Sequence, residues 1–274
     1  MKEYPWNSTY AFAENDVIRC IDLEGLEKAV VITIGYDVEF RGAVLNNLNA
    51  EDVVVFHLKA DSPTLAKDLM EKLAIVSSLD PEGIGFLAIY SHGSPDSGIW
   101  GKEIIDGSEE SFWYSQIAFG DDGDFKLLTN AVNNGAVNFA DKSIIYLGGC
   151  NQCLGVKDEL YSPSQAERWK KAVNISGDKN VSIIGANESV GPKDDSKSIF
   201  EVSDYKAGDF FKISPLGIVN LGNTVNVNNL LTETMADVRG GISDRNRKDY
   251  IKNRNSRNRV ISPLPTLKPK VAPE

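Results

Sequence analysis

The sequence predicts an α/β protein with a mostly parallel central sheet of about six strands that is flanked by helices. Two observations support this prediction. Five short apolar runs, rich in β-branched residues, lack the alternation of a half-exposed strand, so each is typical of a strand buried on both faces. Several of the segments between these runs have helical periodicity, and alternating strands and helices favour parallel pairing.

The predicted strands are short and evenly distributed. The buried runs occupy residues 29–35, 52–58, 84–90, 143–147 and 181–186. Residues 209–213 and 217–221 are predicted to form a sixth strand or a hairpin, and residues 99–104 a small hairpin outside the sheet.

Helical periodicity is clearest over residues 64–79, where leucines recur at helical spacing behind Ser62 and Pro63. Residues 41–50, between the first two strands, can form a couple of helical turns. Further helices are predicted over residues 125–139, with an interruption near Gly135, over 164–173, and near 230–238. The acidic stretch 121–124 is predicted to be a turn.

Charge is distributed unevenly along the chain. The 274 residues carry a formal net charge of −10, but residues 239–274 hold ten Lys/Arg against three Asp/Glu, so this segment is +7 and the remainder −17. The segment is rich in Asn and Arg and then in Pro, with few large apolar residues, which is typical of an extended or disordered chain. We therefore expect a globular domain over residues 1–238 and a basic tail over 239–274.

The composition limits the compartment and the partners. With 42% hydrophobic and 25% charged residues the chain is ordinary for a globular protein, and no apolar run approaches the roughly 18 residues that cross a bilayer. Its three cysteines form no disulfide framework. We expect a cytoplasmic protein, or a module of a longer exported one, without a membrane partner. Since a basic run is usually only solvated, nucleic acid is not an expected partner.

The residues that indicate chemistry are His92 and Cys150, which follow the third and fourth predicted strands. The carboxyl ends of parallel strands meet at one edge of a sheet, about 4.8 Å apart, so these residues are expected to converge on one bound group. Cysteine attacks as a thiolate, and a neighbouring imidazole can activate it or protonate a leaving amine.

Glycines adjoin both residues. Gly93 follows His92, and Gly148 and Gly149 precede Cys150. Residues without a side chain leave the backbone approachable, so the N–H groups of Gly93 and Cys150 are candidate donors to an oxyanion.

Other interpretations of the cysteines and histidines remain open. Cys150 and Cys153 form a CxxC, which leaves a redox dithiol as an alternative; a structural zinc is less favoured because no second CxxC exists. We expect no metal and no other cofactor. His57 lies inside a strand run and Cys20 alternates with apolar neighbours, so both are predicted to be structural.

These motifs together resemble the caspase-like cysteine peptidases of clan CD. The likeness consists of Ser-His-Gly after an apolar strand, a Gly-x-x-Gly turn over residues 98–101, and a second apolar strand ending in Gly-Gly-Cys. It extends over about residues 29–192 and is closest to bacterial caspase-like modules. The resemblance implies a three-layer sandwich, His92 as the catalytic histidine, Cys150 as the nucleophile, and an oxyanion hole of the Gly93 and Cys150 N–H groups.

The chain departs from the family's specificity determinants. Metacaspases and clostripain-like enzymes carry Asp two residues before the nucleophile and caspases carry Gln, but here the position is Gly148. By position, Asp37, Glu188 or Ser189 are candidates to line an acidic or polar pocket, and Arg41 is a candidate to bind an acidic substrate residue.

The sequence therefore predicts a cysteine endopeptidase that acts through a thioester on a protein or peptide, its own basic tail included. The acidic stretch 121–124 is a reason to include calcium or another activator in an assay of this activity. The alternatives are a catalytically silent caspase-like binding scaffold and a thiol-redox protein using Cys150 and Cys153.

Overall fold

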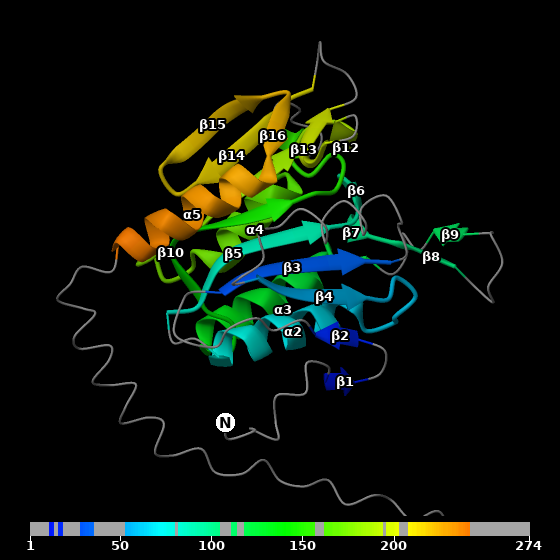
Figure 1. Cartoon of the computed structure of the whole chain (residues 1–274), viewed down its shortest axis with the longest axis horizontal. Helices are drawn as coiled ribbons and strands as arrows, with labels where there is room; N and C mark the ends of the chain where they lie inside the picture. Colours follow the sequence, from blue (N-terminus) through cyan, green and yellow to red (C-terminus); the bar gives the residue numbers. More distant parts are fainter. Residues whose placement is uncertain are drawn as a thin grey trace, which may run out of the picture. The chain divides into compact units, whose positions relative to one another are not determined.

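A seven-stranded sheet organises the protein (Figure 1). The computed structural model describes residues 11–13, 16–18, 28–35, 53–79, 82–104, 111–113, 118–156, 162–193, 196–202 and 208–241. The strand order is β15-β14-β11-β10-β5-β3-β4. The strands are β3 (Lys28–Ile34), β4 (Val53–Leu58), β5 (Ile84–Tyr90), β10 (Phe139–Leu147), β11 (Ser182–Ala186), β14 (Phe210–Ser214) and β15 (Gly217–Gly222).

The α/β class and the mostly parallel sheet are confirmed. Strands β4, β3, β5, β10 and β11 pair in parallel, and they match the five predicted runs. Strands β14 and β15 add an antiparallel hairpin, which is why the sheet has seven strands rather than about six. Strand β10 begins earlier than predicted, at Phe139, because its register shifts between Phe139 and Ile144.

The parallel part of the sheet is largely buried on both faces, as the apolar runs predict, whereas the edge strand β15 is exposed. Successive side chains of a strand point to opposite faces. In β5, Leu87 and Ile89 belong to one hydrophobic cluster, while Phe86 and Ala88 belong to the other. Every residue of this strand is buried, so it lies at the centre of the fold.

Different elements cover the two faces. Helices α2 (Leu65–Leu79), α3 (Asp122–Asn133) and α4 (Gln165–Val173) contribute to the first cluster. Helix α5 (Val227–Gly241) and a three-stranded antiparallel sheet contribute to the second. That sheet consists of β12 (Val190–Lys193), β13 (Ser196–Val202) and β16 (Thr224–Asn226). Figure 1 shows α2 and α3 on one side of the large sheet and α5 on the other.

The prediction for residues 121–139 is wrong at both ends. The acidic stretch is the start of a helix rather than a turn, because Asp121 caps α3 and forms a capping box with Asp124. The helix ends at Asn133, and residues 139 onwards already belong to β10.

The described residues contain no cluster of three or more His, Cys, Asp or Glu side chains that would hold a metal ion.

Short hairpins lie outside the large sheet. Strand β6 (His92–Ser94) pairs with β7 (Gly98–Trp100), and β8 (Lys102–Ile104) pairs with β9 (Ser111–Trp113). The predicted hairpin over 99–104 is therefore divided between two hairpins. A further pair, β1 (Ala11–Ala13) and β2 (Asp16–Ile18), is antiparallel, and a 3₁₀ turn, Leu154–Val156, follows the β10 end.

The chain divides into two units, Met1–Arg239 and Gly240–Glu274. The boundary predicted at residue 238 stays a prediction, because of the second unit only residues 240 and 241 are described. Cys20, Asp37, Arg41, the segment 41–50 and the tail from residue 242 also lie outside the described residues. No helix in the described part of the chain is both long and apolar enough to cross a membrane.

Candidate active site

Strands β5 and β10 deliver His92 and Cys150 to the same edge of the sheet. The two strands are parallel neighbours, with Leu147 opposite Ile89. The ladder continues one step further, because the Gly148 N–H donates to the Ile89 carbonyl at 2.7 Å. The segments that follow β5 and β10 then leave the sheet side by side, as the sequence predicts for neighbouring parallel strands.

The backbones around the two residues lie in direct contact. A Cβ atom on Gly93 would lie 2.9 Å from Cys150 N and would collide with Cys150 O and Gln152 Nε2. A Cβ atom on Gly149 would lie 2.9 Å from His92 O. A side chain at either position would collide with the facing backbone, so the glycines allow these two segments of the chain to pack together. The role of the Gly93 and Cys150 N–H groups as oxyanion donors stays a prediction.

His92 opens the hairpin formed by β6 and β7, called here the His92 hairpin. Its side chain is half-buried, and its ring stacks on Trp100 of β7 with the centroids 5.0 Å apart and the planes 27° apart. In the hairpin register His92 lies directly opposite Trp100. The stacking fixes the plane of the imidazole ring at the edge of the sheet.

Cys150 lies in the turn of residues 148–153, called here the Cys150 turn. Its thiol is free and half-buried, and Sγ accepts a hydrogen bond from the Val190 N–H at 3.3 Å. No acceptor among the described residues binds the Cys150 N–H. The next residue, Asn151, has a φ of 59°, a left-handed conformation that Asn tolerates.

Two buried tyrosine rings pack against Gly148, two residues before Cys150. A Cβ atom on Gly148 would touch the rings of Tyr90 and Tyr146 at 3.1 and 3.2 Å. Both tyrosines are buried, and burial raises the pKa of each hydroxyl well above its usual range. Neither ring is therefore ionised beneath Cys150 at neutral pH.

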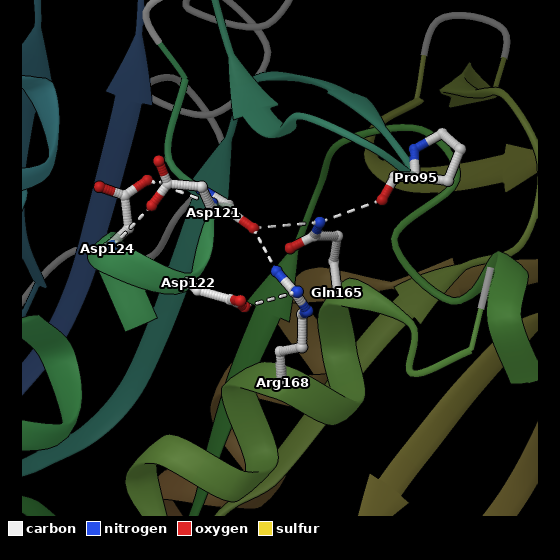
Figure 2. Close-up of polar contacts among 7 residues, drawn as sticks. Pro95, Asp121, Asp122, Asp124, Gln165 and Arg168 are labelled. Carbon is white, nitrogen blue, oxygen red and sulfur yellow. Dashed lines mark hydrogen bonds and ion pairs between the residues drawn. The ribbon is translucent and has the colours of Figure 1, made fainter. Parts of the chain in front are cut away.

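A polar network holds the far end of the His92 hairpin against the helices (Figure 2). The buried Gln165 side chain at the start of α4 donates from Nε2 to Pro95 O at 3.0 Å and to Gly120 O at 3.4 Å. Arg168 donates to Gly120 O at 2.6 Å and pairs with Asp122 at 2.8 Å. The hairpin is thereby fixed to the N-terminal ends of α3 and α4.

The candidate specificity residues are only partly tested. Glu188 lies next to the Cys150 turn, since its carbonyl accepts from the Asn151 N–H at 3.1 Å, and its Cβ and Cγ atoms pack at Gly208. Ser189 is exposed and directly precedes Val190. Gly148 is buried, with its N–H bound in the sheet, and Asp37 and Arg41 lie outside the described residues.

The remaining thiol and imidazole have structural environments. Cys153 is fully buried, and burial, with a smaller contribution from Glu167, raises the pKa of its thiol well above the usual range. His57 lies within β4, and its Nδ1 is 3.0 Å from Thr33 Oγ1 on the neighbouring strand. The structural interpretation of His57 accords with this contact.

Three contributors to the site were not anticipated. Trp100 stacks on His92, Val190 donates its N–H to the thiol, and Gln152 binds the Cys150 carbonyl. A backbone N–H leaves no mark in a sequence. Gln152 lies between the two cysteines of the CxxC, at a position where the motif accepts any residue, so the motif gave no reason to single it out.

The chain matches no protein-family model, and no curated protein is significantly similar to it. Function is therefore inferred from the geometry of the site alone.

Proposed function

We propose that the chain is a cysteine endopeptidase of the caspase-like type, with Cys150 as nucleophile and His92 as general acid–base. The observation that supports this most strongly is the contact between the Gly149–Cys150 backbone and the His92–Gly93 backbone at the carboxyl edge of the sheet. That contact places a thiol, an imidazole and an unbound N–H group within one small region.

The reaction follows from these groups. The Cys150 thiol transfers its proton to His92 as Sγ bonds to the scissile carbonyl carbon. The tetrahedral oxyanion accepts hydrogen bonds from the Cys150 and Gly93 N–H groups. The C–N bond then breaks, and the leaving nitrogen takes the proton from His92, which leaves a thioester. Water attacks the thioester, the C–S bond breaks, and the acid and the free thiol are released.

The environment of the thiol supports a reactive rather than a structural cysteine. Cys150 is only half-buried, and its sulfur accepts a main-chain hydrogen bond that orients it at the edge of the sheet. The buried rings of Tyr90 and Tyr146 at Gly148 strengthen electrostatic interactions with an oxyanion, since the local dielectric constant is low.

For specificity we propose that Glu188 favours a basic residue before the scissile bond. Glu188 is half-buried beside the Cys150 turn, and it is the described carboxylate among the candidate pocket residues.

Under this proposal the Arg-rich tail, residues 239–274, is a candidate site of self-cleavage. Intact masses of wild type and Cys150→Ala after days of incubation test it: a shortened wild type alone supports self-cleavage, and identical masses overturn it.

The test of the main proposal is cleavage of a peptide library by the whole chain, with Cys150→Ala as the control and with calcium present in one arm. Cleavage that disappears in Cys150→Ala supports the peptidase and gives its specificity. If nothing is cleaved in any arm and iodoacetamide labels Cys150 no faster than a free thiol, the silent caspase-like scaffold replaces it.

The thiol-redox alternative gains no support from the surroundings of Cys153. A buried thiol with a raised pKa is a poor partner for exchange, because exchange requires a thiolate.

A further inference from the structure

One buried carboxamide joins the two halves of the candidate site. The Gln152 side chain is fully buried, and its Nε2 donates to Cys150 O at 3.0 Å and to Gly98 O at 3.3 Å. Gly98 opens β7, the strand that pairs with the strand of His92. A single NH₂ group therefore binds the Cys150 turn and the His92 hairpin at once.

The orientation of this carboxamide follows from its partners. Both bound atoms are carbonyl oxygens, which only accept, so the NH₂ group and not the oxygen must face them. The Gln152 Oε1 atom is buried and has no hydrogen-bond partner among the described residues. The unpaired Oε1 costs desolvation free energy, which the two hydrogen bonds from Nε2 to the backbone carbonyls offset.

The hydrogen bond from Gln152 fixes the peptide group that follows the nucleophile. The peptide between Cys150 and Asn151 is bound at both ends: Gln152 holds its carbonyl, and its N–H donates to Glu188 O at 3.1 Å. The Cys150 Cα, which carries both the thiol side chain and the N–H, is covalently attached to this anchored peptide. Holding the peptide therefore restricts the position from which the thiol and the oxyanion donor project.

Gln152 is itself held by its surroundings. Its carbonyl accepts from the Ala166 N–H of α4 at 2.9 Å, and its Cβ lies 3.0 Å from where a side chain on Gly185 would begin. On the other side Nε2 lies against Gly93. The carboxamide is thus packed between α4, β11 and the hairpin, which leaves it little freedom to adopt another rotamer.

We propose that Gln152 is a positioning residue that keeps the Cys150 thiol and N–H in register with His92 for the acyl-transfer step. The proposal rests on the proposed peptidase function and adds a determinant of its rate. Gln152 does not touch the substrate, because its side chain is buried. Its loss is therefore expected to lower kcat and to leave KM unchanged.

Gln165 provides a matched control. It is also a buried glutamine, its Nε2 also binds two backbone carbonyls, one of them in the same hairpin, and its Oε1 also lacks a partner in the described part of the chain. Unlike Gln152 it has no bond to the Cys150 turn. Gln152→Met and Gln165→Met remove the same donors and nearly conserve volume, so they differ chiefly in the contact with Cys150.

The experiment compares the whole-chain wild type, Gln152→Met, Gln152→Asn and Gln165→Met on a peptide found by the library assay. We expect kcat to fall about 10- to 100-fold in both Gln152 variants, the range typical of a small misplacement of catalytic groups, with KM changed less than about twofold. We expect Gln165→Met to lower kcat less than either Gln152 variant, because it leaves the bond to the Cys150 turn intact. Alkylation of Cys150 by iodoacetamide, measured well below the unfolding temperature, should slow in the Gln152 variants only.

The outcomes separate the two proposals. A wild-type kcat in a folded Gln152 variant overturns the positioning role, and so does an equal loss in Gln165→Met, which would indicate general loosening of the hairpin. Should Gln152→Met fail to fold, Gln152→Asn, which keeps an amide but is too short to reach both carbonyls, gives the same comparison. A wild type that hydrolyses nothing, with a Cys150 that His92→Ala leaves unchanged, would instead overturn the peptidase function itself.

Discussion

Cys150 and Cys153 lie three residues apart in one turn, yet their surroundings differ in every respect that governs reactivity. Cys150 is half-buried and binds a main-chain N–H, whereas Cys153 is fully buried against Gly185 of β11, with its thiol pKa raised by burial. The first side chain lies at the open edge of the sheet and the second in the hydrophobic core. Residue type is identical, so position alone separates a candidate nucleophile from a core residue.

The largest expected effect concerns these two thiols directly. Cys150→Ala removes the nucleophile and should lower kcat/KM at least about 10³-fold. Cys153→Ala should retain kcat/KM within a few-fold and lose about 1 kcal/mol of unfolding free energy to a small cavity. Peptide hydrolysis and urea unfolding of both variants provide the check. Comparable losses of activity in the two folded variants would contradict the distinction.

The two histidines extend the comparison. His92→Ala removes the general acid–base and should lower kcat about 10²- to 10⁴-fold, and it should slow iodoacetamide labelling of Cys150. His57→Ala, whose imidazole contacts Thr33 inside the sheet, should leave both rates nearly unchanged. Labelling of the folded variants, read by mass spectrometry at each cysteine, measures the difference. Equal labelling rates in the His92 variant and wild type would argue against the dyad.

Substitution of Gly149, the glycine beside the nucleophile, by alanine should lower stability and kcat more than the same substitution at an ordinary glycine. Gly149→Ala places a methyl group 2.9 Å from His92 O. We therefore expect a loss of about 1–3 kcal/mol in unfolding free energy. We also expect a lower kcat, because the His92 and Cys150 segments must move apart. Gly191→Ala is the control, because nothing lies within 4 Å of its added carbon and its expected change is within about 0.5 kcal/mol. Thermal unfolding measures the stability and peptide hydrolysis measures kcat. Similar stability of the two variants would refute the close contact between Gly149 and the His92 carbonyl.

The smallest expected effect depends on pH. Burial raises the pKa of Cys153, Tyr90 and Tyr146 above their unfolded values, so the folded state retains protons that the unfolded state releases. Stability is then fully present below the unfolded pKa values and declines as the pH rises above about 9. Tyr146→Phe should reduce this alkaline decline and, since the Tyr146 hydroxyl has no partner among described residues, cost little at pH 7. Tm measured from pH 7 to 11 in both proteins tests this, and parallel curves would contradict it.

Sequence reasoning succeeded where an apolar run ends in glycine. The ends of β5 and β10 were predictable because runs buried on both faces imply a parallel sheet, and parallel strands bring His92 and Cys150 to one edge. It failed at Asp121, where a helix cap and a loop have the same composition. It also failed for the sheet of β12, β13 and β16, whose strands are short or mixed in polarity and carry no clear period.

The tertiary part of the site was beyond sequence patterns for a different reason. The contacts of Gln152 and Val190 join segments about 40 to 54 positions apart, and each uses a backbone group on one side. Backbone groups are the same at every position, so no residue type marks them. Gly93 and Gly149 did indicate where two backbone segments can pack in direct contact.

The hydrogen bond from Val190 to the thiol has a spectroscopic consequence. The Val190 amide proton points at the sulfur, so its ¹H and ¹⁵N chemical shifts report on the charge of that sulfur and on any adduct formed there. Alkylation of the sulfur changes its strength as an acceptor, so the resonance should move when iodoacetamide modifies Cys150. The first residue of β12 thus reports on adducts at the Cys150 turn, without any label near the sulfur.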